Sequence, residues 1–160
     1  MRAIGFGMNH SDLLARFVAD LDVDVVLCAG RWSLLRRCAF DDLLPVCERR
    51  GTSVVVGGVY NSGLLAAPGP DATFDYVQAP PHLVARARRL AAVCAEFGVP
   101  LRAAALRFPS ATRRGGGRRR AATPAEAREN AELFGHDIPD ELWRALVGHG
   151  LLDDDIPLPV

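Results

Sequence analysis

The sequence predicts an α/β protein with a single domain, and two features carry that prediction. Residues 54–56 are three consecutive valines, a β-branched run that suits a strand buried on both faces of a helix-covered parallel sheet. Short apolar runs also occupy 2–9 and 24–28, and each is followed by a polar loop and a helical pattern. Strands that alternate with helices in this way predict a β/α barrel or an open doubly wound sheet.

The predicted helices carry apolar residues on one face at helical spacing, and several have recognisable ends. Ser11 or Asp12 would cap the first helix, and Gly51 would end the second. Thr123 would cap a later helix. Residues 68–81 are rich in proline and glycine and are predicted to form a loop. The predicted helices cover 11–20, 41–49, 81–97, 99–106, 123–134 and 139–147.

The composition argues against several partners and against one type of chemistry. The 19 basic and 19 acidic residues give a formal net charge of zero, so charge does not indicate a nucleic acid or a membrane as partner. The longest apolar runs are too short to span a bilayer. All basic residues are arginines, and the absence of lysine excludes Schiff-base chemistry within this chain.

The cysteines and histidines show no spacing typical of metal ligands. No two cysteines form a CxxC motif and no two histidines share a helix at ligand spacing, so no metal site is predicted. With no signal peptide in front of them, the cysteines are interpreted as free thiols, which predicts a cytoplasmic location. The residues concerned are Cys28, Cys38, Cys47, Cys94, His10, His82, His136 and His149.

The loop after the valine strand is the first candidate for a binding site. The strand ends at Gly57 and Gly58, where the backbone turns sharply or a ligand approaches it without meeting a Cβ atom. Enzymes of the α/β class build their binding sites at the carboxyl ends of their strands. An ordinary strand-to-loop junction is the alternative. The glycines do not match the GxGxxG dinucleotide fingerprint, so the sequence gives little support for a Rossmann fold.

Several ordered segments resemble one known family. The segments are RAIGFGMN, DVVLCAGRWSLL, VVVGGVYNSGLLA, RARRLAAVCAEFGVPLRAAALRFP and TPAEARENAELF. They resemble the aldo/keto reductase family, and most closely its D-threo-aldose 1-dehydrogenase and L-fucose dehydrogenase group. The resemblance extends over nearly the whole chain but only over the carboxyl-terminal half of the family's (β/α)₈ barrel. It implies that residues 1–160 form a partial barrel covering strands five to eight.

The resemblance also implies a function and a limit to it. Members of the family are NAD(P)-dependent oxidoreductases that move a hydride between the cofactor and a sugar or aldehyde. Their catalytic Asp, Tyr, Lys and His belong to the amino-terminal half, so we expect the isolated chain to be inactive. The alternative is a non-catalytic half-barrel that acts as a cofactor-binding or interaction module. Because a half-barrel has open strand edges, we expect the isolated chain to form a dimer or larger assembly, or to aggregate, rather than to be a stable monomer.

By resemblance, two strand ends supply residues of the cofactor site. Asn9 corresponds to the asparagine after strand five that holds the nicotinamide carboxamide. Gly58, Tyr60 and Ser62 lie on the loop after strand seven, which surrounds the pyrophosphate. Trp32 follows strand six, where the family often has an aromatic residue. It would line the substrate pocket or belong to the core.

The adenine end of the cofactor is assigned to the fifth predicted helix. Glu129 and Asn130 match the polar pair that binds adenine in the family. Glu126 stands where NADP-preferring members often carry an arginine for the 2′-phosphate. A carboxylate would repel that phosphate, which favours NAD over NADP. For each of these residues, the alternative is a polar surface side chain without a ligand.

The segment 110–122 departs from the family pattern. The family places its eighth strand here, but this chain has arginines and glycines that are unsuited to a buried central strand. A basic loop for phosphate or RNA is one interpretation. A reading-frame slip that is later restored is the interpretation we favour, because family-like sequence resumes at Thr123. We therefore expect 113–120 to be exposed and irregular, without strand pairing.

Overall fold

The chain forms an open parallel sheet with helices packed on one of its faces. The computed structural model describes residues 3–112, 115–117 and 123–159. Its main sheet has the order β1-β2-β3-β6, and every neighbouring pair is parallel. These strands are β1 (Gly5–Met8), β2 (Val25–Ala29), β3 (Ser53–Gly57) and β6 (Gly115–Gly117). The predicted α/β class is confirmed.

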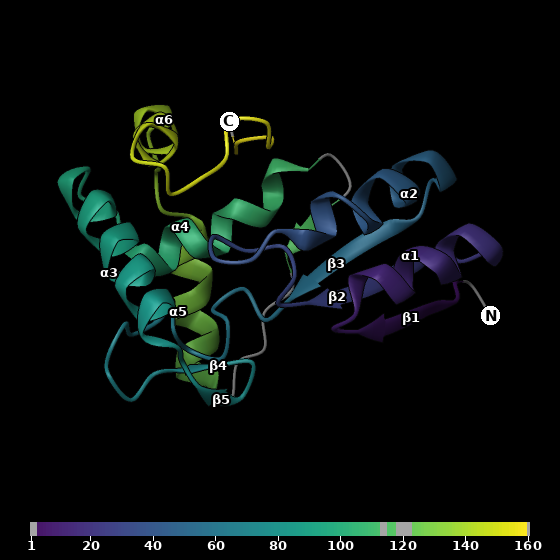
Figure 1. Ribbon diagram of the computed structural model, residues 1–160, viewed down its shortest axis with the longest axis horizontal. Coiled ribbons are helices and arrows are strands. Elements are labelled where there is room, and N and C mark those ends of the chain that lie inside the picture. The colour runs from purple at the N-terminus through teal and green to yellow at the C-terminus, as the bar shows by residue number, and fades with distance from the viewer. Residues whose placement is uncertain (1–2, 113–114, 118–122, 160) are drawn as a thin grey trace.

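The helices lie close to their predicted positions. Helices α1 and α2 lie beside strands β1 to β3, whereas α3 to α6 gather at the other end of the molecule (Figure 1). No described helix is long and apolar enough to cross a membrane. The helices are α1 (Ser11–Asp20), α2 (Leu43–Arg50), α3 (Pro81–Glu96), α4 (Leu101–Arg107), α5 (Pro124–Phe134) and α6 (Asp140–Gly148), with 3-10 turns η1 (Cys38–Phe40) and η2 (Phe108–Ala111).

Local chemistry explains two of the helix ends. Gly51 ends α2 with a left-handed φ of 74°, and the Thr123 side chain accepts a hydrogen bond from the backbone of Glu126 at the start of α5. The cap predicted for α1 is wrong, because its N-cap is His10. The Ser11 hydroxyl instead donates to Asp42 Oδ2 at 2.8 Å and so joins α1 to α2.

The two faces of the sheet have different surroundings. Val26, Val54 and Val56 point to the helices and are at most 2% exposed. Leu27 and Val55 are register partners on the opposite face, and Leu27 is 39% exposed. Because successive side chains of a strand point to opposite faces, one face is packed and the other is open.

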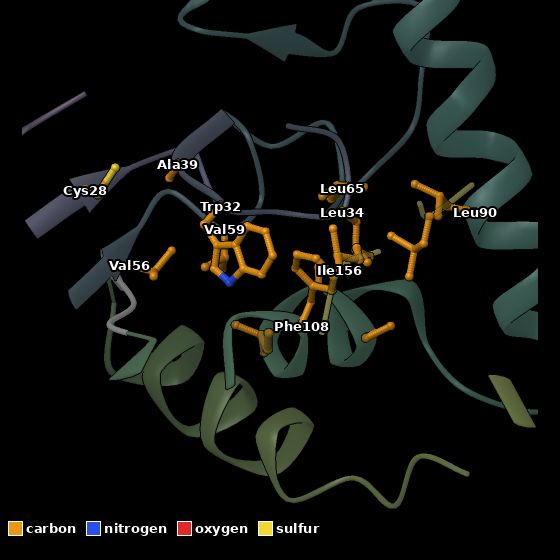
Figure 2. Close-up of a cluster of buried hydrophobic side chains, with 14 of the residues drawn as sticks. Cys28, Trp32, Leu34, Ala39, Val56, Val59, Leu65, Leu90, Phe108 and Ile156 are labelled. Atoms are coloured by element: carbon orange, nitrogen blue, oxygen red, sulfur yellow. The ribbon is translucent and has the colours of Figure 1, made fainter. Parts of the chain in front are cut away.

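An aromatic cluster forms the centre of the core. Trp32, Phe108 and Trp143 are at most 1% exposed. The ring centroids of Trp32 and Phe108 are 4.9 Å apart, and those of Phe108 and Trp143 are 6.5 Å apart. Figure 2 shows Trp32, Val59 and Phe108 within this cluster of buried side chains. The cluster joins the loop after β2 to the helices of the second half of the chain.

Two predictions about irregular segments are wrong in part. Gly115–Gly117 form β6, which pairs in parallel with β3 between Val54 and Val56. Glycines have no side chain that must be buried, so this short strand can add to the edge of the sheet without placing arginine inside it. The flanking 113–114 and 118–122 lie outside the described residues. The predicted loop 68–81 contains a hairpin of β4 (Thr73–Phe74) and β5 (Val77–Gln78).

Candidate functional site: a cavity at the carboxyl ends of the strands

A cavity of about 880 Å³ opens where the first three strands end. Its walls come from the carboxyl ends of β1, β2 and β3, from the loop after β3, and from the β4–β5 turn. This is the edge at which parallel α/β sheets place their ligands. The lining residues are Gly7, Met8, Asn9, Leu27, Ala29, Gly30, 57–63, Asp75 and Tyr76.

Four of the predicted cofactor residues share this cavity. Asn9 follows β1, whereas Gly58, Tyr60 and Ser62 follow β3. Gly58 has a φ of 63°, and a Cβ atom on it would lie 3.2 Å from the backbone nitrogen of Gly30. A side chain at this position would therefore be strained and also crowded against the loop after β2.

The backbone around the cavity is strained. In the part of the chain that the structure describes, the only non-glycine residues with positive φ are Asn61, Ser62, Asp75 and Tyr76. All four line this cavity. Left-handed backbone is costly for residues with a Cβ atom, and such strain concentrates at ligand sites.

Asn61 adds an unsatisfied polar atom to the cavity wall. Its side chain is 3% exposed, and its Nδ2 donates to the backbone oxygen of Gly30 at 3.5 Å. Its Oδ1 has no hydrogen-bond partner among the described residues. Because a buried acceptor without a partner is costly, a ligand or solvent donor would stabilise it. Asn61 was not among the residues predicted from the sequence, because no local pattern signals a buried acceptor that lacks a partner.

The β4–β5 hairpin is fastened to the loop that follows β3. Thr73 Oγ1 donates to the Ser62 backbone oxygen at 2.7 Å, and the Tyr76 backbone nitrogen donates to Ser62 Oγ at 3.1 Å. Asp75 forms ion pairs with Arg31 at 3.1 Å and with Arg36 at 2.6 Å. The hairpin was not predicted, although its residues supply one side of the cavity.

The adenine-binding pair predicted on α5 lies next to the loop after β3. The Tyr60 hydroxyl donates to Asn130 Oδ1 at 2.9 Å. Arg102 lies over the Tyr60 ring at 5.6 Å from its centroid and also pairs with Glu129. The hydrogen bond to Glu129 raises the pKa of Arg102, because it favours the charged guanidinium. Tyr60 therefore connects the cavity to the residues predicted to bind adenine.

The remaining two predicted residues lie outside the described cavity wall. Trp32 is 0% exposed and packs in the core, so of its two predicted roles the structure shows the core one. Its neighbours Phe40 and Phe108 pack against the indole, and Trp32 is not among the residues that line the cavity. Glu126 is exposed in the first turn of α5, one turn before Glu129.

Two known dehydrogenases are similar to this chain in sequence. No family model matches the chain. The chain is 38% identical over 161 residues to a pyridoxal 4-dehydrogenase of Microbacterium luteolum, covering 95% of this chain and 45% of that protein. It is 42% identical over 153 residues to a D-threo-aldose 1-dehydrogenase of a Pseudomonas species, covering 91% of this chain and 45% of that protein.

Several solved structures are similar to this chain in fold, at lower sequence identity. An aldo-keto reductase of Bacillus halodurans in its holo form superposes with a TM-score of 0.69 and 16% identity, over 97% of this chain and 51% of that one. A glycerol dehydrogenase of Gluconobacter oxydans superposes with a TM-score of 0.62 and 18% identity, covering 96% of this chain and 51% of that one. The chain has the fold of half an aldo/keto reductase barrel. Sequence and fold both relate it to aldo/keto reductases, and it spans about half the length of the curated relatives it matches.

Proposed function

We propose that this chain is the dinucleotide-binding, carboxyl-terminal half of an NAD(P)-dependent aldo/keto reductase. The observation that carries the proposal is the common location of Asn9, Gly58, Tyr60 and Ser62 in one cavity at the strand ends. The relatives are named as dehydrogenases of an aldose and of pyridoxal, which supports a sugar or aldehyde as the substrate of the complete barrel.

The residues present suit a dinucleotide. The Asn9 amide has both donor and acceptor groups for the nicotinamide carboxamide, and Asn61 Oδ1 supplies a buried acceptor without a protein partner among the described residues. Ser62 Oγ accepts from the Tyr76 backbone nitrogen and keeps its own proton to donate to a phosphate oxygen. Glu129 and Asn130 would bind the adenine. The bound cofactor would accept or supply a hydride.

Binding of NADH to the purified chain tests this function. We expect NADH fluorescence to change on binding, and we expect Asn9→Ala and Ser62→Ala to weaken affinity about tenfold, as loss of one or two hydrogen bonds does. Ser53→Ala is the matched control, because Ser53 is exposed at the other end of β3. A folded wild-type chain that binds no NADH, or site variants that bind as well as Ser53→Ala, would overturn the proposal.

The preference for NAD over NADP depends on Glu126. A carboxylate in the first turn of α5 would repel a 2′-phosphate, whereas a ribose hydroxyl could donate to it. We expect Glu126→Arg to raise the ratio of NADPH affinity to NADH affinity at least tenfold. Glu126→Gln separates the loss of the negative charge from the gain of a positive one. If neither variant changes the ratio, Glu126 does not contact the ribose.

A further inference from the structure

The turn of the β4–β5 hairpin carries an unusual residue. Asp75 has a φ of 49° and Tyr76 a φ of 68°, and they are the two loop residues between register partners Phe74 and Val77. A two-residue turn with positive φ at both positions favours Asn-Gly, because glycine has no Cβ atom to be strained. This chain places a tyrosine at the position where glycine is preferred.

Packing within the chain does not offset that strain. The Tyr76 side chain is 89% exposed, so its ring gains little from burial. Tyr76 is nevertheless one of the residues that line the cavity. A strained residue with an exposed aromatic ring beside a cavity suggests a contact with a ligand rather than a contribution to folding.

The backbone that carries the ring is held in place. The Tyr76 backbone nitrogen donates to Ser62 Oγ at 3.1 Å. Asp75, the other turn residue, is paired with Arg31 and Arg36. Gly63 also forms a parallel bridge with Thr73. These contacts fix the turn on the loop that lines the cavity, so stacking on Tyr76 would require little further ordering of the backbone.

We propose that Tyr76 is a ligand-binding residue whose ring stacks on a planar ring of the dinucleotide. The inference rests on the proposed function for the identity of the ligand. Tyr60 and Asn130 lie deeper and contribute polar groups, whereas Tyr76 contributes an exposed aromatic face at the cavity wall. Aromatic faces bind flat rings by offset stacking, and this contact needs no hydrogen bond.

Three substitutions test the role of the ring. Tyr76→Gly removes the ring and the strain, so we expect a melting temperature no lower than that of the wild type together with at least fivefold weaker NADH binding. Tyr76→Phe keeps the ring, and we expect its NADH affinity within twofold of the wild type. Val77→Ala is the matched control, because Val77 is 65% exposed on the same hairpin and is not among the described cavity residues.

The outcomes separate this inference from the proposed function. A wild-type chain that binds no NADH overturns both. NADH binding that Tyr76→Gly leaves unchanged within twofold overturns only the role of Tyr76. A loss of both melting temperature and affinity in Tyr76→Gly would show that the ring supports the fold, and would also overturn it. Binding of AMP and of nicotinamide mononucleotide to the wild type and to Tyr76→Gly shows which of the two rings stacks.

Discussion

The Tyr60 hydroxyl donates a 2.9 Å hydrogen bond to Oδ1 of Asn130, which lies 70 residues further along the chain. The bond joins the loop after β3 to helix α5. Two parts of the sequence that were assigned separately, one to the pyrophosphate and one to the adenine, are therefore in direct contact. Asn130 is only 5% exposed, so this contact is partly shielded from solvent.

We expect Tyr60→Phe and Asn130→Ala to be coupled. A double-mutant cycle measured by urea unfolding should give a coupling energy of about 0.5–1.5 kcal/mol, the usual net value of one hydrogen bond. Tyr76→Phe is the control for loss of a tyrosine hydroxyl and should leave the free energy of unfolding unchanged, because Tyr76 is 89% exposed. Strictly additive effects would mean that the Tyr60–Asn130 bond does not form in solution.

We expect Trp32 to stabilise the fold rather than to bind the ligand. Trp32→Ala is expected to lower the free energy of unfolding by about 3–5 kcal/mol, as removal of a buried aromatic ring does. Trp32→Phe should cost less, because the indole Nε1 has no hydrogen-bond partner among the described residues and its loss removes a buried unpaired donor. NADH affinity of folded Trp32→Phe should equal that of the wild type. A changed affinity at unchanged stability would place Trp32 at the ligand.

Three of the four cysteines should be chemically inert in the folded chain. Burial raises the pKa of Cys28 to about 12 and those of Cys47 and Cys94 to about 11. Cys38 is exposed. At pH 8 we expect iodoacetamide to add one group, at Cys38, and mass spectrometry of Cys38→Ser should show no addition until the protein is unfolded.

Because of the same thiols, the free energy of unfolding should fall as the pH rises into the alkaline range. Their pKa values in the fold lie above the unfolded value of about 8.5, so the folded chain holds these protons more tightly. Their contribution is fully present below about pH 8.5 and is lost as the pH rises through about 11 to 12. Urea midpoints measured between pH 8 and pH 11 should fall, and an unchanged midpoint would contradict the burial of these thiols.

The open face of the sheet should promote self-association. Leu27 is 39% exposed there, and among the described residues neither β1 nor β6 has a strand on its outer edge. The structure supplies four parallel strands, so two copies could supply the eight strands of a closed barrel. We expect the isolated chain to be dimeric or larger by light scattering at micromolar concentration.

Leu27→Lys should shift this assembly toward the monomer, because burying a leucine is worth about 1.5–3 kcal/mol and burying a charge is unfavourable. Leu21→Lys is a suitable comparison, since Leu21 is 44% exposed but follows α1 rather than lying on the sheet. Equal effects of the two substitutions, or a monomeric wild type, would argue against assembly through the open face.

The isolated chain should bind cofactor without turning over an aldose. It contains no lysine, and the family it resembles uses a catalytic lysine together with Asp, Tyr and His. Absorbance of NADH should therefore not increase when the chain is mixed with NAD and L-fucose. Turnover above background, retained after a further purification step, would show that this half contains a complete catalytic centre.

The sequence by itself determined the helices, the first three strands and their order, but not β4, β5 or β6. The periodic spacing of apolar residues, the valine run and the turn residues are local signals in the sequence. Helix ends such as Gly51 and Thr123 could therefore be located from residues a few positions away in the sequence. The strand that precedes Gly58 could be placed in the same way, which made the loop after β3 a candidate site.

Only the tertiary structure decided what each side chain faces. Trp32 is in the core because Phe108, far away in the sequence, packs against it, and Trp143 in turn packs against Phe108. The Asn61 side-chain oxygen has no partner among the described residues, and 115–117 pair with β3, because of how distant segments pack together. These outcomes depend on long-range contacts, which periodicity and capping signals do not encode, since those signals report only on residues a few positions apart.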